Sequence, residues 1–514
     1  MGKELGWRFP LDEARSVMEL AESFAVPIAD ELREAAQKIP GPRERPPSLV
    51  PSSLPWWEQL YPFQKEGVAH LLRHPHTILG DDLGLGKSIQ SLTACLAWNY
   101  LPILILCPPS LVDAWAVTIK SWGRFAVTYD VIRSGKPRAI RPAQVVICPY
   151  SLVRDWEDAL VKLRPGALIC DEIHNARNKK TILAQSLLHI TDSLPNEAMV
   201  LGLSATLLVN KPFELIMPLT ITRMFDRVVD DSRGKGWEEF VTTYCDGHFN
   251  GFNWETDGAS NLEQLHARMR EAGYLRRLKT TVLAQLPPVV YDTIEVPLTT
   301  TQERALRAME ADIVSYLREH TPERADAAQR AEALVRLNEM RKYLGNAKAK
   351  HIAAWAREWV ENSGQKLLLF AVHREVQQEL ARLTKAPLLG ASLNSRQISA
   401  TVGAFQEGKH PILVASLHAM SEGLTLTAAG AVAFAELPWT SARFNQAIGR
   451  AYGRLNDAHG VLVYLLNAGF IDDTLMELIV AKDQNGAIVQ SGTQDSALAG
   501  LLASRQEWLD TWSA

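Results

Sequence analysis

A lysine and a serine, Lys87 and Ser88, end the glycine-rich segment GDDLGLGKS. A short apolar strand that ends in Ile78 and Leu79 is predicted before this segment, and helical spacing resumes from Ile89. A strand, a glycine-rich loop and a helix in this order present backbone N–H groups that can cradle a triphosphate. In such a loop the lysine ammonium reaches the β- and γ-phosphates, and the hydroxyl holds Mg²⁺. The residue types therefore predict a site for a nucleoside triphosphate and Mg²⁺, with Lys87 catalytic and Ser88 a metal ligand.

The loop departs at one position from the strict pattern G-x-x-x-x-G-K-[ST], because Asp81 stands where the first glycine is expected. Gly84 and Gly86 still allow the backbone to turn. The residues predicted to line the nucleotide are Asp81, Asp82, Leu83, Gly84, Leu85, Gly86, Lys87 and Ser88. The alternative interpretation is a glycine-rich turn between a strand and a helix that carries a surface lysine.

Two carboxylates, Asp171 and Glu172, follow a second apolar run in the segment ALICDEIH at 167–174. A buried parallel strand delivers such residues to the carboxyl edge of its sheet. Asp171 suits the Mg²⁺ site, and Glu172 is suited to position and deprotonate an attacking water. The alternative is an acid pair at a strand end that simply faces solvent.

Composition limits the class of protein. The chain has 514 residues, 47% of them hydrophobic, which predicts two or three well-buried domains. A net charge of −4 excludes a wholly cationic surface, so that any nucleic-acid site must be a local groove. The five cysteines form no C-x-x-C pair and are interpreted as reduced core residues of a cytosolic protein. No apolar run has membrane-spanning length, and the charged N-terminus does not resemble a signal peptide.

Apolar stretches of strand length alternate with helical segments in two parts of the chain, which predicts parallel sheets built from βαβ units. The first part has predicted strands near 78 and at 104–107, 145–148, 168–170 and 200–203. The second has them at 366–371, 412–415, 432–435 and 461–465. The predicted fold class is α/β, with two lobes, helical insertions and a small N-terminal helical appendage.

The predicted domains follow this alternation. An N-terminal helical segment with a Pro-rich linker covers 1–55, and the first lobe, with a helical insertion, covers 56–290. A charged helical linker covers 291–362, the second lobe 363–485 and a C-terminal tail 486–514. Because the phosphate loop occurs only in the first lobe, the second lobe is expected to supply an arginine to the nucleotide.

The segment FNQAIGRAYGRLN offers Gln446, Arg450 and Arg454 for this role. One arginine inserted at the γ-phosphate raises the hydrolysis rate by about 10³ to 10⁵. The alternative is a surface helix whose arginines only interact with solvent.

From about 61 to 478 the chain resembles Swi/Snf-type DNA translocases of helicase superfamily two, whose motifs occur here in family order. GDDLGLGKS resembles the family's DEMGLGKT, DEIH resembles DEAH, and KLLLFAVHREV and SEGLTLTAA resemble motifs of the second lobe. The resemblance implies two RecA-like lobes that use ATP and Mg²⁺. It also implies that Gln64, in YPFQKEGV, reads the adenine base and that Gly423 lies at the nucleotide.

The resemblance further implies contacts with DNA. CPPSLVDAW and PYSL are similar to segments that lie along one strand, and SAT at 204–206 is similar to the motif that couples hydrolysis to DNA. YLRRLKTTVLAQLPP at 274–288 is similar to the family's brace between the lobes. The residues implied in nucleic-acid contact or coupling are Ser110, Ser151, His174, Ser204, Thr206, Arg276, Arg277 and Ser416.

Three further segments look like the HepA-related annealing helicases, which remodel stalled forks: WEEFVTTYCDG, SNLEQLHARM and VAFAELPW. One motif departs from the family pattern QAxDRxHRxGQ, because Gly453 takes the place of the second arginine and Arg454 follows it. We interpret this as a one-residue shift and expect both Arg450 and Arg454 to reach the nucleotide.

The function implied is an ATP-dependent translocase on double-stranded or branched DNA, with annealing or fork-remodelling activity, in the cytoplasm of a bacterium or of a viral host. A strand-separating DNA or RNA helicase of the same superfamily is one alternative. Another is an ATP-gated DNA clamp with weak turnover, in which the altered arginine motif slows hydrolysis.

Overall fold

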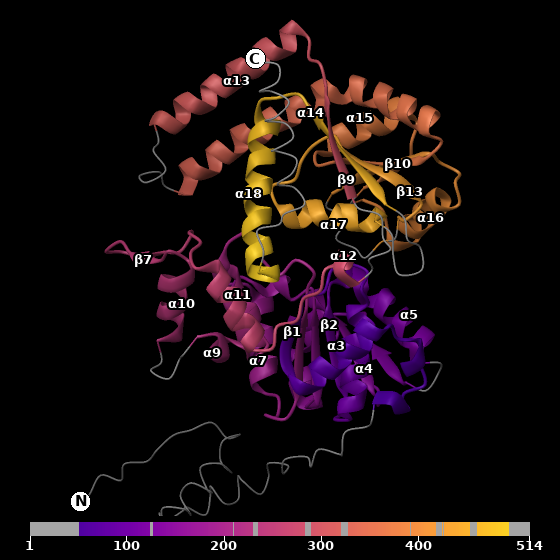
Figure 1. Ribbon diagram of the computed structural model, residues 1–514, viewed down its shortest axis with the longest axis vertical. Helices are drawn as coiled ribbons and strands as arrows, with labels where there is room; N and C mark the ends of the chain where they lie inside the picture. Colours follow the sequence, from indigo (N-terminus) through magenta and orange to yellow (C-terminus); the bar gives the residue numbers. More distant parts are fainter. Residues whose placement is uncertain are drawn as a thin grey trace, which may run out of the picture.

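The computed structural model describes residues 51–123, 127–208, 210–229, 235–282, 289–319, 327–390, 392–417, 424, 426–452 and 460–492. The predicted N-terminal helical segment, most of the C-terminal tail, Gly423 and Arg454 lie outside these residues. The described chain forms two lobes stacked along the long axis of the molecule (Figure 1). The predicted α/β class with two parallel-sheet lobes is confirmed.

Lobe 1 contains a six-stranded, all-parallel sheet in the order β1-β6-β5-β2-β4-β3. Its strands are β1 His76–Leu79, β2 Ile103–Cys107, β3 Tyr129–Val131, β4 Val145–Pro149, β5 Ala167–Asp171 and β6 Met199–Leu203. Its helices include α3 Pro62–Arg73, α4 Lys87–Trp98, α5 Val112–Gly123, α6 Val153–Leu163 and α7 Ile182–Asp192. Alternate residues of β2 pack into different cores, one with α3, α4 and α5 and the other with α6 and α7. Both faces of the sheet are thus covered, as continuous apolar strands require.

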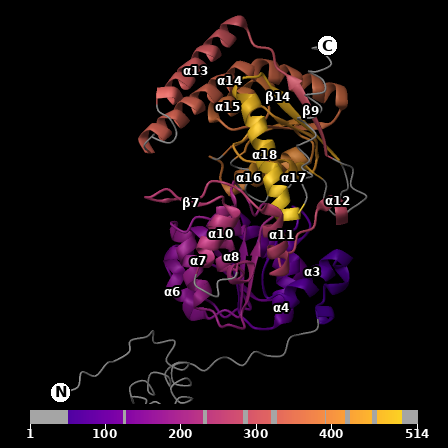
Figure 2. The same cartoon turned by 60° about the vertical axis from the view of Figure 1, so that its left-hand side comes forward.

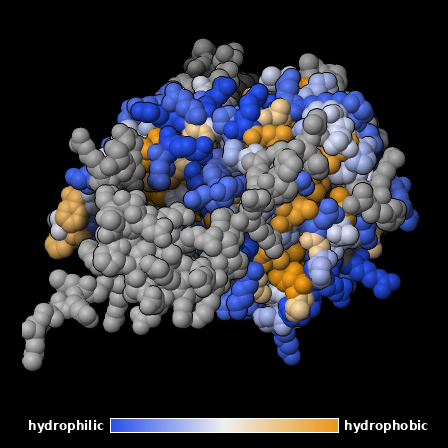
Figure 3. All heavy atoms as spheres, turned by 90° about the horizontal axis from the view of Figure 1, so that it is seen from below, coloured by the Kyte–Doolittle hydropathy of each residue, from blue (hydrophilic) through white to orange (hydrophobic). Residues whose placement is uncertain are grey.

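A helical insertion follows β6, as predicted. It contains η7 Pro212–Leu215, α8 Ile216–Ile221, α9 Phe225–Val228, α10 Gly236–Tyr244, β7 His248–Phe249, β8 Trp254–Glu255 and α11 Leu262–Glu271. The antiparallel hairpin β7–β8 projects from the flank of lobe 1 in both ribbon views (Figure 2), and Phe252 at its tip is 89% exposed. Seen from below, hydrophobic residues reach the visible surface of the described chain in groups between hydrophilic ones (Figure 3).

Lobe 2 contains a second six-stranded parallel sheet, in the order β11-β12-β10-β13-β14-β9. Its strands are β9 Val289–Glu295, β10 Lys366–Ala371, β11 Leu388–Leu389, β12 Ile412–Ser416, β13 Ala429–Phe434 and β14 Val461–Asn467. Its helices are α13 Thr300–Glu319, α14 Ala327–Ser363, α15 Arg374–Thr384, α16 Ser395–Gln406, α17 Ser441–Ala451 and α18 Ile471–Ser491. The expected division at 290/291 falls inside β9, which pairs along its whole length with β14.

Helix α18 connects the two lobes. Ile479 and Val480 pack in the lobe 2 core, whereas Ile488 and Val489, near the helix end, pack in the lobe 1 core. The expected division at 485/486 therefore falls within this helix. No described helix combines the length and the apolar character needed to cross a lipid bilayer. All five cysteines are buried free thiols, as predicted.

Candidate active site

The phosphate loop connects β1 to α4, and its glycines adopt left-handed backbone conformations. Gly84 has φ 85° and Gly86 φ 78°, a region that residues with a Cβ rarely adopt. The Lys87 Nζ donates hydrogen bonds to the carbonyl oxygens of Asp81 at 2.7 Å and Asp82 at 3.3 Å. Burial lowers the pKa of Lys87, and the negative charges of Glu172 and Asp81 oppose this shift. Bound phosphates would oppose it further.

Gln64 lies beside this loop. Its side-chain Nε2 donates a hydrogen bond to the Leu85 carbonyl at 3.1 Å, and its Oε1 accepts one from the backbone N–H of Tyr61. A Cβ at Gly86 would lie 2.5 Å from Gln64 Nε2, so that the glycine permits this close approach. In the structure Gln64, expected to read the adenine, contacts the turn of the phosphate loop.

The two aspartates of the loop carry arginine partners from the segment 274–279. Asp81, which is fully buried, accepts hydrogen bonds from Arg277 through both carboxylate oxygens, including Nη2 at 2.5 Å. Asp82 pairs with Arg276 at 2.9 Å. A backbone hydrogen bond also connects the loop with this segment, since the Gly80 N–H donates to the Leu275 carbonyl at 2.7 Å. Arg276 and Arg277, expected near DNA, thus hold the base of the phosphate loop.

The acidic strand end lies at the carboxyl edge of β5, as the sequence predicts. Asp171 Oδ2 accepts a hydrogen bond from Trp115 Nε1 at 2.8 Å, and Tyr150 donates its hydroxyl to the Asp171 carbonyl at 2.6 Å. Burial and the neighbouring Glu172 raise the pKa of Asp171. A bound divalent cation would favour the ionised form of this carboxyl. Neither Trp115 nor Tyr150 could be assigned to Asp171 from sequence, since they lie 56 and 21 residues away.

Glu172 has φ 51°, a left-handed conformation that residues with a Cβ adopt uncommonly. Burial would raise its pKa, but a hydrogen bond from His174 and the charges of Lys87 and Arg450 outweigh it and lower the pKa. His174 Nδ1 lies 3.2 Å from Glu172 Oε2. The carboxylate of Glu172 is therefore held in the ionised form that a general base requires.

A chain of hydrogen bonds leads from Glu172 to lobe 2. The His174 ring lies 2.9 Å from Ser204 Oγ, which in turn lies 3.4 Å from Glu172 Oε2. Ser204 Oγ accepts the backbone N–H of Thr206 at 3.2 Å, and the Thr206 hydroxyl accepts Gln446 Nε2 from α17 at 3.3 Å. The chain connects the Glu172 carboxylate with the second lobe.

Helix α17 also brings Arg450 to the site. Arg450 is 7% exposed, and its charge helps to lower the pKa of Glu172. A Cβ at Gly449 would lie 2.6 Å from Leu83 Cδ1, which shows how closely α17 approaches the tip of the phosphate loop. The structure thus brings Lys87, Glu172 and Arg450 together.

The residues expected along DNA are divided between two environments. Ser110 lies in η4 Pro109–Leu111 and Ser151 in η5 Tyr150–Leu152, directly after β2 and β4. They share the carboxyl edge that carries Asp171. A cavity of about 290 Å³ opens there, lined by Pro108, Pro109, Tyr150, Glu172, His174, Asn175, Leu183 and Gln446. Ser416 instead lies in lobe 2, at the end of β12, where it is buried with 4% of its surface exposed.

A phosphate loop and an acidic strand end facing an arginine of a second parallel-sheet lobe define a helicase-like nucleotide-binding protein. Residues 63–346 match the family model of the SNF2-related domain, and residues 350–455 match that of the helicase conserved C-terminal domain. The chain belongs to the SNF2-related family, which confirms the Swi/Snf-type resemblance.

Similar proteins include the "SWI/SNF-related matrix-associated actin-dependent regulator of chromatin subfamily A-like protein 1" of Drosophila melanogaster. It is 28% identical over 442 residues, which cover 83% of this chain and 55% of the relative. The human "DNA annealing helicase and endonuclease ZRANB3" is 28% identical over 437 residues, 81% of this chain and 39% of the relative. The chain therefore spans about half or less of these relatives. A solved "Sulfolobus solfataricus SWI2/SNF2 ATPase core in complex with dsDNA" aligns at 18% identity over 85% of this chain and 94% of that chain, with TM-score 0.39.

Proposed function

We propose that the protein is an ATP-dependent translocase on double-stranded DNA that remodels branched DNA and reanneals separated strands. The observation that carries this proposal is the hydrogen-bonded chain from Glu172 to Gln446. A motor needs such a connection, because chemistry at the nucleotide must change how the two lobes are arranged. Family membership, together with relatives that are named annealing helicases, supports DNA as the track.

In this proposal the phosphate loop binds ATP, and Lys87 neutralises charge on the β- and γ-phosphates. Ser88 and Asp171 would hold Mg²⁺, which would supply charge neutralisation when bound. A hydroxyl and a carboxylate suit Mg²⁺, because this cation keeps its other positions for phosphate oxygens and water. In the described part of the chain, no group of three or more histidine, cysteine or acidic side chains could enclose a metal by itself.

Glu172 positions and deprotonates the attacking water, and Arg450 stabilises charge on the transferred phosphoryl group. Arg454 remains a second candidate for this arginine role. We also propose that Gln64 and Gly423 contact the nucleotide. For Gln64 the support is its position beside the phosphate loop.

DNA is proposed to lie along the carboxyl edge that carries Ser110 and Ser151. Contacts there would be to phosphates, which carry no sequence information. Binding should therefore tolerate any sequence and weaken steeply with salt.

The experiment is a steady-state ATPase measurement with no nucleic acid, duplex DNA, single-stranded DNA, a forked junction or RNA. Duplex or forked DNA should stimulate hydrolysis. Glu172→Gln should lower the stimulated rate by about 10² to 10⁴, the contribution of a general base, and retain ATP binding. Stimulation by RNA alone, or by none of these, would contradict the proposal.

A further inference from the structure

Arg276 contacts the phosphate loop, the segment after β6 and the end of α18, the helix that crosses from lobe 2 to lobe 1. Within lobe 1 its Nη1 donates to the carbonyl oxygens of Gly80 at 2.9 Å and Ala205 at 2.7 Å. Its Nη2 pairs with the Asp82 carboxylate at 2.9 Å. One planar guanidinium therefore connects Gly80 and Asp82 of the phosphate loop with Ala205. Ala205 lies in the segment after β6, between Ser204 and Thr206. The rigid donor fork of arginine suits such a role better than a lysine would.

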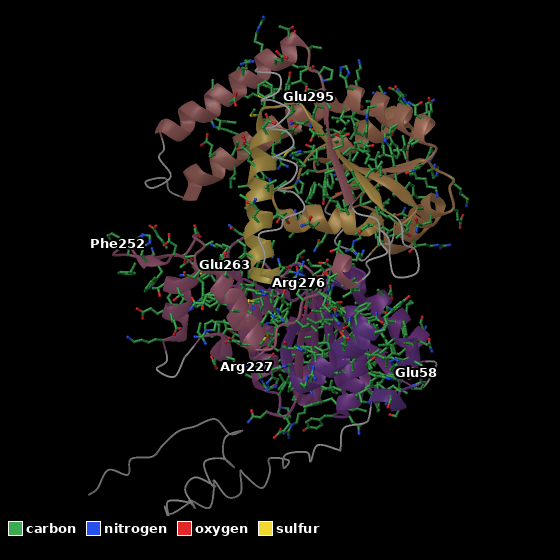
Figure 4. All side chains as sticks on the ribbon, in the orientation of Figure 1. Glu58, Arg227, Phe252, Glu263, Arg276 and Glu295 are labelled. Atoms are coloured by element: carbon green, nitrogen blue, oxygen red, sulfur yellow. The ribbon has the colours of Figure 1, made fainter. Side chains whose placement is uncertain are left out.

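The same guanidinium reaches the last turn of α18. Nη1 lies 3.2 Å from Gln490 Oε1, and Nε donates to Ser491 Oγ at 3.1 Å. Gln490 is 7% exposed, and its Oε1 also accepts the backbone N–H of Leu207 at 3.2 Å. Figure 4 shows Arg276 at the lower end of α18, where this helix meets lobe 1. The end of α18 is thus hydrogen-bonded to the residue that holds the phosphate loop.

Helix α18 is anchored in lobe 2 by its first half. Leu475, Ile479 and Val480 are buried in the lobe 2 core. A continuous helix of 21 residues is stiff, so that movement of lobe 2 displaces its far end, including Gln490, relative to Arg276. A cavity of about 480 Å³ lies beside this contact, and its lining includes Lys279, Tyr452, Gln490 and Ser491. The cavity leaves room for such a displacement.

We propose that Arg276 is a positioning residue that transmits the position of α18 to the phosphate loop. When lobe 2 moves on DNA, α18 changes the hydrogen bonds of Gln490 and Ser491 to Arg276. Arg276 then shifts Gly80 and Asp82, and with them the loop that carries Lys87. The contact makes the hydrolysis rate respond to DNA. This inference rests on the proposed DNA-stimulated ATPase.

The test measures the ratio of DNA-stimulated to basal ATPase rate in Gln490→Ala. A purely structural defect lowers the active fraction and leaves this ratio unchanged. We expect the ratio to fall about tenfold, within the usual range of coupling between sites, with the basal rate close to that of the unchanged protein. Gln490→Glu keeps an acceptor for both Arg276 and Leu207 and should restore most of the ratio.

Lys482→Ala is the matched control, because Lys482 Nζ links α18 to Asn210 of lobe 1 at 3.1 Å without touching Arg276. Its ratio should stay within about twofold of the unchanged protein. An unaltered ratio in Gln490→Ala, or an equal fall in Lys482→Ala, would overturn the inference. If the unchanged protein shows no DNA stimulation at all, the proposed function fails first, and the two failures are thereby distinguished.

Discussion

At the scale of single residues, the site depends on charges that neutralise one another before any nucleotide binds. Asp81 and Asp82 lie in a loop that must attract phosphates, yet each carboxylate is neutralised by an arginine from the segment 274–279. The loop can therefore contain two acids and still present its backbone N–H groups to an anion. The replacement of the expected glycine by Asp81 is explained by Arg277, which lies 196 residues away in sequence.

Replacing Arg277 with glutamine leaves the buried Asp81 without its ion partner. We expect the free energy of unfolding to fall by about 3–5 kcal/mol, the usual cost of breaking a buried pair, as measured by urea denaturation. Adding Asp81→Asn to this variant should recover part of the loss, because the uncompensated buried charge disappears.

The same variant distinguishes the loop role of Arg277 from a DNA contact. If Arg277 binds only the loop, the slope of log affinity for duplex DNA against log salt stays the same. A slope smaller by about 1 would instead assign Arg277 to a DNA phosphate.

The single residues most accessible to sequence reasoning were those with local motifs. Lys87, Ser88, Asp171 and Glu172 could be selected as candidate site residues because a few neighbouring residues form a recognisable motif around each. Trp115, which donates to Asp171, could not, since its pairing depends on how β2 and β5 lie side by side in the sheet. Such partners require the tertiary fold.

At the scale of elements, strands that form continuous apolar runs could be predicted from the sequence, whereas β9 and β11 could not. β10 and β12 are almost wholly buried and read as continuous apolar runs. β9 lies at the edge of its sheet and is only partly buried, and β11 has two residues, so neither gives that signal. The crossing of α18 between lobes was also beyond prediction, because a helical pattern does not say which cores the helix enters.

Helix α17 of lobe 2 is linked to the Glu172 carboxylate by hydrogen bonds that pass through Thr206 and Ser204. We expect Gln446→Ala to lower the DNA-stimulated ATPase kcat about tenfold, because it removes the hydrogen bond to Thr206 that completes the chain from Glu172. The global unfolding midpoint should change little, since this contact is a single neutral hydrogen bond at the lobe boundary.

Asn445→Ala provides the comparison, because Asn445 contacts Asp483 within lobe 2 at 2.7 Å. Its kcat should stay within about threefold of the unchanged protein, since the Thr206 contact remains intact. Equal losses in the two variants would show that α17 packing, rather than the chain to Glu172, controls the rate.

At the scale of the whole molecule, the two lobes meet through α17, α18 and the segment 274–279. Helix α17 approaches the phosphate loop at Leu83 and bonds to Thr206 after β6, and the end of α18 bonds to Arg276, which holds the loop. Helix α18 also contacts α11 of lobe 1 through His266. The arrangement of the lobes and the geometry of the loop are therefore physically connected, which a DNA motor requires and a passive nucleotide-binding protein does not.

Displacement of a third strand from a triplex on duplex DNA tests this account most directly, because the third strand leaves only when a protein moves along the duplex. We predict displacement that requires ATP and is abolished in Glu172→Gln. The account is contradicted if ATP is hydrolysed without displacement while a tailed duplex is unwound. Tight ATP-dependent DNA binding with neither displacement nor phosphate release would contradict it equally, and would identify a clamp.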